Sequence, residues 1–91
     1  MELKDLREKI DSIDDELVEL LLERLEVSRK VADIKALKNM PVFNPEREKE
    51  ILDEIKDKTG ENAKYILPII ETILKTSKEL QEDALKERKG R

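Results

Sequence analysis

A cation interrupts an otherwise apolar helical pattern in the first third of the sequence. Apolar residues recur there at alternating steps of three and four, and Arg24 takes the place between Leu20 and Val27. Burying an arginine without a counter-ion typically costs several kcal/mol. Its guanidinium could instead bind an anion, because it grips a carboxylate bidentately. Two structural roles stay open for Arg24: pairing with a buried Glu, or reaching solvent from the helix edge.

Two further cations share this helical pattern. Lys35 follows Arg24 by eleven residues, close to three turns, so both project from nearly the same face, about 16 Å apart along the axis. Arg7 precedes Lys35 by 28 residues, which is four heptads, and both flank the apolar seam. Lysines and arginines at such edges are ordinary in helix bundles, so each alone is more simply explained as a solvated side chain.

Polar residues also lie on or beside apolar faces later in the chain. Ser77 interrupts the stripe of the last helical segment, and Gln81 follows one turn later on the same face. A serine in a helix often donates a hydrogen bond back to a backbone carbonyl of the preceding turn. Charged residues at a helix start, such as Arg47 and Glu48, often serve only the helix cap or the helix dipole. Considered together, these polar groups and the cations predict a site for a small ligand with more than one carboxylate.

The composition restricts the chemistry of such a site. The 91 residues include no Cys and no His. This excludes thiolate nucleophiles, cysteine-based zinc sites and the commonest general base. The net charge of −4, with both signs interleaved, argues against a nucleic-acid partner. No apolar run is long enough for a membrane and no signal-peptide pattern is present, so we expect a cytoplasmic protein that binds no membrane.

The apolar pattern predicts one unusually long helix within a single domain, residues 1–91. It contains no Gly or Pro, and Asn39 followed by Pro41 is its expected stop, which places it from about Leu3 to about Lys38. Such a rod is about 54 Å long, whereas a compact chain of this size is only about 30 Å across. A second copy of the chain is the simplest cover for the stripe. A kinked or frayed helix is the alternative.

Two shorter helices are expected after the loop that follows. Asn44 and Pro45 fit the N-cap and first position of the second helix, and Gly60 fits its end. Asn62 is a candidate cap for the third helix. Pro68 is expected in or near the first turn of that helix, because a deeper proline would kink it. No strand signal is present, so the predicted fold class is all-α.

The functional residues stand within a longer series of motifs that covers nearly the whole chain. The series is Leu6-Arg7-Glu8-Lys9-Ile10-Asp11, Ile13-Asp14, Leu20-Leu21, Glu23-Arg24, Val31-Ala32, Lys35, Pro41-Val42, Pro45-Glu46-Arg47-Glu48, Ser77 and Gln81. In this order and spacing it resembles the all-helical family of chorismate mutases. The resemblance implies an intertwined six-helix homodimer of three-helix protomers. It also implies rearrangement of chorismate to prephenate in phenylalanine and tyrosine biosynthesis, without metal or other cofactor.

The same resemblance implies a role for each candidate residue. Arg24 and the partner's Arg7, which reaches across the interface, bind the two carboxylates. Lys35 and Gln81 face the ether oxygen whose bond to the ring breaks, so these two and Arg24 are the expected catalytic residues. Glu48 accepts a hydrogen bond from the ring hydroxyl, and the remaining contacts come from Arg47 and Ser77. Some relatives carry an acidic residue in place of Asn44, which puts a direct substrate role for Asn44 in doubt.

Two other functions and one other domain organisation remain compatible with the residues alone. A lyase on the same scaffold, releasing pyruvate from isochorismate, would use the same cations, because both substrates are dicarboxylates. A helical dimerisation or regulatory module without catalysis is a second alternative. The chain is also compatible with being one domain of a longer enzyme.

Overall fold

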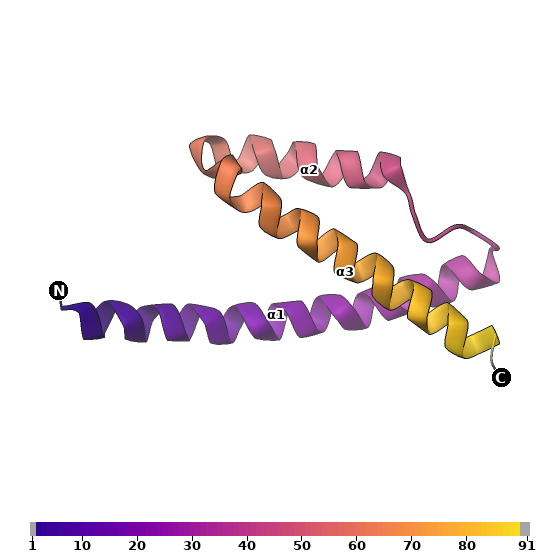
Figure 1. The fold of residues 1–91 in the computed structure, drawn as a ribbon, viewed down its shortest axis with the longest axis horizontal. Coiled ribbons are helices and arrows are strands. Elements are labelled where there is room, and N and C mark those ends of the chain that lie inside the picture. The colour runs from indigo at the N-terminus through magenta and orange to yellow at the C-terminus, as the bar shows by residue number, and fades with distance from the viewer. Residues whose placement is uncertain (1, 90–91) are drawn as a thin grey trace.

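The computed structural model describes residues 2–89, and this part of the chain is helical without any strand (Figure 1). The elements are α1 (Leu3–Leu37), α2 (Pro45–Thr59), a short 3-10 helix η1 (Gly60–Asn62) and α3 (Ala63–Lys89). The predicted all-α class is therefore confirmed. Across residues 2–89, no helix combines the length and the apolar character that a membrane crossing requires.

The first helix runs the full length of the molecule. At its start the backbone N–H of Glu2 donates to Asp5 Oδ2 at 3.3 Å, and after Leu37 the chain turns through Asn39, whose φ is 56°. The molecule measures 55 × 29 × 14 Å, with a radius of gyration of 16.6 Å. A compact chain of this length would have a radius of gyration of about 12 Å. The expected long rod is thus present as one continuous helix, and the alternative of a kinked or frayed helix is wrong.

The third helix covers only part of α1. It crosses the C-terminal half of α1 and pairs along its own N-terminal half with α2, whose backbone does not come close to that of α1 (Figure 1). The tightest packing is at the crossing, where Ala32 of α1 is 1% exposed and Leu74 of α3 is 7% exposed. These two are the only buried apolar residues in the described part of the chain. The α1–α3 crossing therefore fixes the positions of the side chains that lie between these two helices.

The apolar stripe of α1 lies beside this crossing and is bare in the single chain. Its members are 39–62% exposed: Leu3, Leu6, Ile10, Ile13, Leu17, Leu20, Val27, Val31 and Ile34. The face of α1 that meets α3 carries Ser28 and Ala32 instead. A bare stripe of this length exceeds what monomeric proteins normally expose. The stripe is therefore a surface that the protomer does not cover by itself.

The second helix begins as its sequence predicts. Asn44 is the N-cap, with its side-chain Oδ1 accepting from the backbone N–H of Arg47 at 3.1 Å, and Pro45 is the first helical residue. The helix ends at Gly60, whose φ of 54° and ψ of −121° lie in a region favoured by glycine. The C-terminal cap expected at Gly60 is confirmed.

The start of α3 differs from the prediction at Asn62. Asn62 ends η1, which continues directly into α3, and no cap hydrogen bond from the Asn62 side chain is found within residues 2–89. Pro68 is the sixth residue of α3, in the second turn, so it lies next to the first turn and not within it. The proline removes only the bond to the carbonyl of Lys64. Both residues are exposed, and water can therefore satisfy that carbonyl.

The backbone at Gly60 gives a test of this turn. A Cβ added there meets no atom within 4 Å, so only the backbone conformation opposes a larger residue. We expect Gly60→Ala to lower the free energy of unfolding by about 1–3 kcal/mol. Urea unfolding at one fixed protein concentration measures this loss. Lys58→Ala, an exposed change in α2, is the control and should stay within about 0.5 kcal/mol of the parent; equal stability of the two variants would refute the strain at Gly60.

Candidate active site

A cavity of about 300 Å³ opens between the C-terminal half of α1, the start of α2 and the middle of α3. Six of the seven residues predicted to form the site line it: Arg24, Lys35, Arg47, Glu48, Ser77 and Gln81. Asn44 lines it as well. Arg7 does not, because it is exposed on the N-terminal half of α1, about 25 Å along the axis from Arg24. The structure thus brings together the predicted site residues of one protomer except Arg7.

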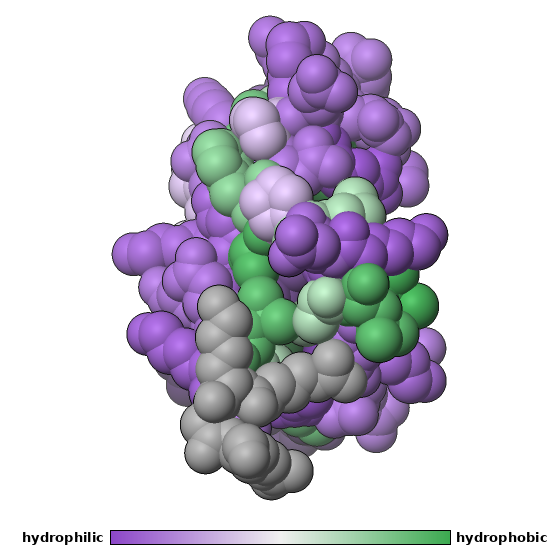
Figure 2. Space-filling view, turned by 90° about the vertical axis from the view of Figure 1, so that its right-hand side faces the viewer, coloured by the Kyte–Doolittle hydropathy of each residue, from purple (hydrophilic) through white to green (hydrophobic). Residues whose placement is uncertain are grey.

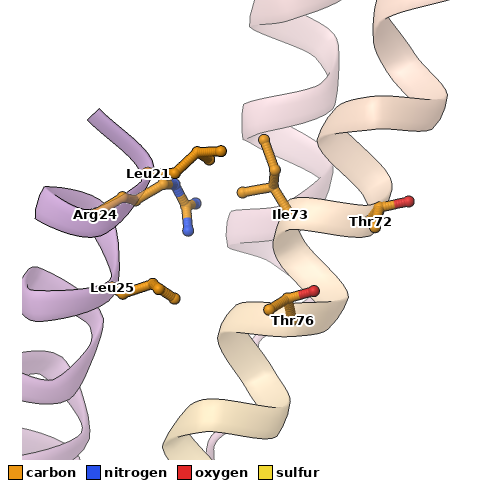
Figure 3. A pocket seen from close by; sticks show the side chains of 6 residues that line it. All are labelled: Leu21, Arg24, Leu25, Thr72, Ile73 and Thr76. Carbon is orange, nitrogen blue, oxygen red and sulfur yellow. The ribbon is translucent and has the colours of Figure 1, made fainter. Parts of the chain in front are cut away.

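The Arg24 side chain lies between this cavity and a second one of about 270 Å³. Figure 3 shows its guanidinium in the space between α1 and α3, facing Ile73. Arg24 is half-buried, and no residue of the described chain forms a hydrogen bond or ion pair with it. Pairing with a buried Glu within the protomer is therefore wrong. A half-buried cation without a partner is instead available to an anion.

The ammonium of Lys35 is fixed at the opposite end of the cavity. Its Nζ donates to the backbone carbonyl of Val42 at 2.6 Å, in a partly buried position. This bond ties the loop between α1 and α2 to the last turns of α1. An ammonium has three N–H donors, so the bond to Val42 leaves others for a ligand.

Three buried polar side chains meet where α1 and α3 cross. Ser28 and Ser77 join their hydroxyls at 2.8 Å, and Gln81 Nε2 donates to Ser77 Oγ at 3.4 Å. All three residues are less than 9% exposed, and Gln81 Oε1 has no partner within residues 2–89. An orphaned buried polar atom in a cavity wall needs a hydrogen-bond partner, which a ligand or a water molecule can supply. If the amide turned by half a rotation, Oε1 would accept from Ser77 and the NH₂ would face the cavity.

Ser28 also lines the cavity, and the sequence analysis missed it. It follows Arg24 by four residues, so it lies on the same side of α1, and it lines the same cavity. Its polar character on the face that meets α3 was the available signal. That signal was hidden because the apolar stripe, not this face, dominates the periodicity of α1.

The two charged residues at the start of α2 have different partners. Arg47 is exposed and forms an ion pair with Glu50 one turn further along α2. Glu48 is paired across the cavity with Lys78 of α3, whose Nζ lies 3.0 Å from Glu48 Oε2. The sequence analysis also missed Lys78, because thirty residues separate it from Glu48 and no periodicity links them.

The charges around the cavity favour an anionic ligand. Four cations line it, Arg24, Lys35, Arg47 and Lys78, against the single carboxylate of Glu48. No cluster of three or more metal-ligating side chains occurs in residues 2–89. The arrangement can therefore bind a small dianion and hold positive charge beside it in a partly buried space. Fold and site together define an all-helical protein with a cavity whose lining suits a small dianion.

The comparisons with known proteins identify the family. The family model described as chorismate mutase type II matches residues 6–82, and the chain belongs to this family. A chorismate mutase from Methanocaldococcus jannaschii is 34% identical over 88 residues, which are 93% of this chain and 89% of that protein. A bifunctional chorismate mutase/prephenate dehydratase from Aquifex aeolicus is 46% identical over 54 residues, 59% of this chain. That match spans only 15% of the bifunctional protein.

A solved structure has the same fold and carries a ligand. It is the crystal structure of chorismate mutase from Helicobacter pylori in complex with prephenate, with a TM-score of 0.83 and 38% sequence identity. The match covers 93% of this chain and 94% of that one. A Pyrococcus furiosus protein described as conserved hypothetical is also 38% identical, with a TM-score of 0.71 over 87% of this chain. Both matches extend well beyond the α1–α3 crossing.

The buried hydroxyl pair provides a test of how the site is held together. We expect Ser28→Ala to lower the free energy of unfolding by about 1 kcal/mol, because the Ser77 hydroxyl loses a buried partner. Urea unfolding measures the change, with the exposed Ser12→Ala of the same helix as the matched control. The double variant with Ser77→Ala should cost less than the two single changes together. Strict additivity would show that the hydroxyls do not interact.

Proposed function

We propose that this chain is a chorismate mutase domain, spanning residues 1–91, that converts chorismate to prephenate. The observation that carries the proposal is the cavity itself, which within residues 2–89 is lined by Arg24 without a partner, by Lys35 held at the Val42 carbonyl, and by Gln81 with its Oε1 unpaired. Support also comes from the family, and from the prephenate bound by the similar Helicobacter pylori enzyme. We expect the reaction to proceed without metal or other cofactor and in the cytoplasm.

The reaction fits a chain that has neither His nor Cys. The rearrangement breaks the ether C–O bond and forms a C–C bond within one molecule, so it needs no nucleophile and no proton transfer. The protein can accelerate it by holding the substrate in its compact reactive conformer. In the proposal Arg24 binds one carboxylate and the partner's Arg7 binds the other. Both carboxylates are thereby fixed relative to the bond that forms.

The second contribution is fixed charge at the ether oxygen. Negative charge gathers there as the C–O bond breaks, and Lys35 and Gln81 are the proposed donors to it. Lys35 is held in place in advance by the Val42 carbonyl, so little reorganisation is needed as the charge develops. The Gln81 amide presents its NH₂ once Ser77 satisfies its oxygen. In a partly buried cavity such charges interact more strongly than at a surface.

The remaining polar residues would bind the periphery of the substrate. Glu48 is the proposed acceptor for the ring hydroxyl, and Arg47 and Ser77 complete the carboxylate and hydroxyl contacts. Arg47 would have to leave Glu50, which is possible at low cost because that ion pair is solvent-exposed. Asn44 lines the cavity, but its side-chain oxygen is already used as the helix cap.

A homodimer would provide two features that the single chain lacks. The bare stripe of α1 needs a cover, and the cavity lacks Arg7. In a twofold dimer residue i meets j and j meets i, so bringing the partner's Arg7 to Arg24 places the axis near the middle of α1, about residue 16. That antiparallel pairing would bury the two stripes along each other from Leu3 to about Val27, whereas Val31 and Ile34 extend past the start of the partner's α1. We therefore propose an intertwined six-helix homodimer with two sites.

The activity can be tested with one matched pair of variants. We expect the protein to consume chorismate, followed by its absorbance, and Lys35→Ala to lower kcat/KM about 100-fold or more. Lys30→Ala, an exposed change on the same helix, should retain the parent rate. Absence of any rate above background for the parent would refute the proposal. Pyruvate as the product from isochorismate, with chorismate inert, would favour the lyase, and intact folding with no chemistry would favour the dimerisation module.

The shared site can be tested by mixing two inactive variants. Arg7→Ala and Arg24→Ala chains, unfolded and refolded together, form mixed dimers in which one site has both arginines. We expect the mixture to regain about a quarter of the parent activity, since half the dimers are mixed and one site in each is intact. Each variant refolded alone is the control. A mixture no more active than its components would show that Arg7 does not act across the interface.

A further inference from the structure

The ion pair between Glu48 and Lys78 differs from the other ion pairs in the described chain. Three of those others join residues three or four positions apart on one helix, and their side chains are at least half exposed. Glu48 and Lys78 instead join α2 to α3, with side chains 23% and 31% exposed. The Lys78 ammonium lies within 3.4 Å of both carboxylate oxygens. Such a pair holds the carboxylate in one orientation, whereas the exposed local pairs do not.

An aromatic ring covers the same ammonium. Lys78 Nζ lies 4.6 Å from the centre of the Phe43 ring, within the range of a cation–π contact. Phe43 belongs to the loop between α1 and α2, which Lys35 anchors through the adjacent Val42 carbonyl. Lys78 of α3 therefore contacts both the loop and α2. Figure 2, which faces the loop end of the molecule, shows apolar patches there within a mostly hydrophilic surface.

The proposed function creates an electrostatic difficulty at Glu48. A carboxylate beside a dianionic substrate is repelled, and the repulsion grows as the ligand displaces water from the cavity. An adjacent ammonium offsets this repulsion without removing the acceptor. An ionised carboxylate has about four lone-pair positions, so pairing with Lys78 leaves room for a hydroxyl. A paired carboxylate can thus remain next to two substrate carboxylates, whereas an isolated one would tend to turn away.

We propose that Lys78 is a positioning residue that makes Glu48 a selective acceptor for the ring hydroxyl of the substrate. The inference rests on the proposed function and adds a residue to it. Lys78 acts through Glu48 and does not itself bind the substrate carboxylates, since its ammonium is already held between Glu48 and Phe43. Selectivity for the hydroxyl-bearing substrate over an analogue without the hydroxyl therefore depends on Lys78.

The experiment compares two substrates in the full chain: chorismate, and its analogue in which hydrogen replaces the ring hydroxyl. For each, kcat and KM are measured in the parent and in Lys78→Met, Lys78→Arg and Glu48→Gln. We expect the parent to prefer chorismate by about tenfold or more in kcat/KM, as for a hydrogen bond to a charged group. Lys78→Met should reduce this preference to about threefold or less, and Lys78→Arg should restore it. Lys75→Met, exposed on the same helix, should change neither value.

A double variant separates positioning from direct binding. If Lys78 acts through Glu48, Lys78→Met should cost little further chorismate activity in a chain that already carries Glu48→Gln. A full additional loss there would show that Lys78 contacts the substrate itself and would overturn the proposal. An equal fall for both substrates in Lys78→Met, with the preference unchanged, would mean a purely structural role and would also overturn it. Because the preference is a ratio within one preparation, partial unfolding does not alter it.

The parent measurement separates this inference from the function on which it rests. If the parent does not rearrange chorismate, both the proposed function and the role of Lys78 are refuted. If the parent is active and Lys78→Met retains its preference for the hydroxyl, only the role of Lys78 is refuted.

Discussion

The length of α1 is the constraint on which the rest of the structure depends. One unbroken helix spans the 55 Å molecule, and α3 can cover only its C-terminal half (Figure 1). The protomer therefore has a small core centred on Ala32 and Leu74, and a long bare stripe. A chain built in this way cannot gain much stability from its own contacts. In the proposed dimer, the fold and the site both depend on the partner that covers this stripe.

The α1–α3 crossing combines packing with polar chemistry. The buried residues there include Ser28, Ser77 and Gln81 as well as the two apolar ones. Polar groups in so small a core contribute less stability than apolar side chains of the same size would. Their hydrogen bonds satisfy most of them but leave Gln81 Oε1 without a partner in the described chain. A lower contribution of the crossing to stability is expected where a ligand completes the hydrogen bonding of its polar groups.

The sequence predicted the features that are local or periodic. Asn44 and Pro45 begin α2 because capping involves residues within one turn, and Arg24 and Lys35 were found because they share a helix with a clear period. Ser28 and Lys78 were missed because their partners are 49 and 30 residues away, and only the crossing of helices brings them together. Pro68 lies deeper in α3 than its residue type favours, because the carbonyl that it leaves without a helical partner, on Lys64, belongs to an exposed residue. The predicted role of Arg7 in binding a substrate carboxylate stays a prediction, since Arg7 lies outside the cavity of its own protomer.

The distribution of charge explains how a chain with a net charge of −4 can hold a dianion. Around the cavity the balance is reversed, because cations from all three helices face one carboxylate there, and that carboxylate is paired with Lys78. The acidic residues elsewhere are largely on exposed helix faces, where solvent screens them beyond about 10 Å. The field at the site is therefore set by its lining and not by the net charge. In the proposed dimer the partner's Arg7 would add to this field, so assembly and binding of a dianion would favour each other.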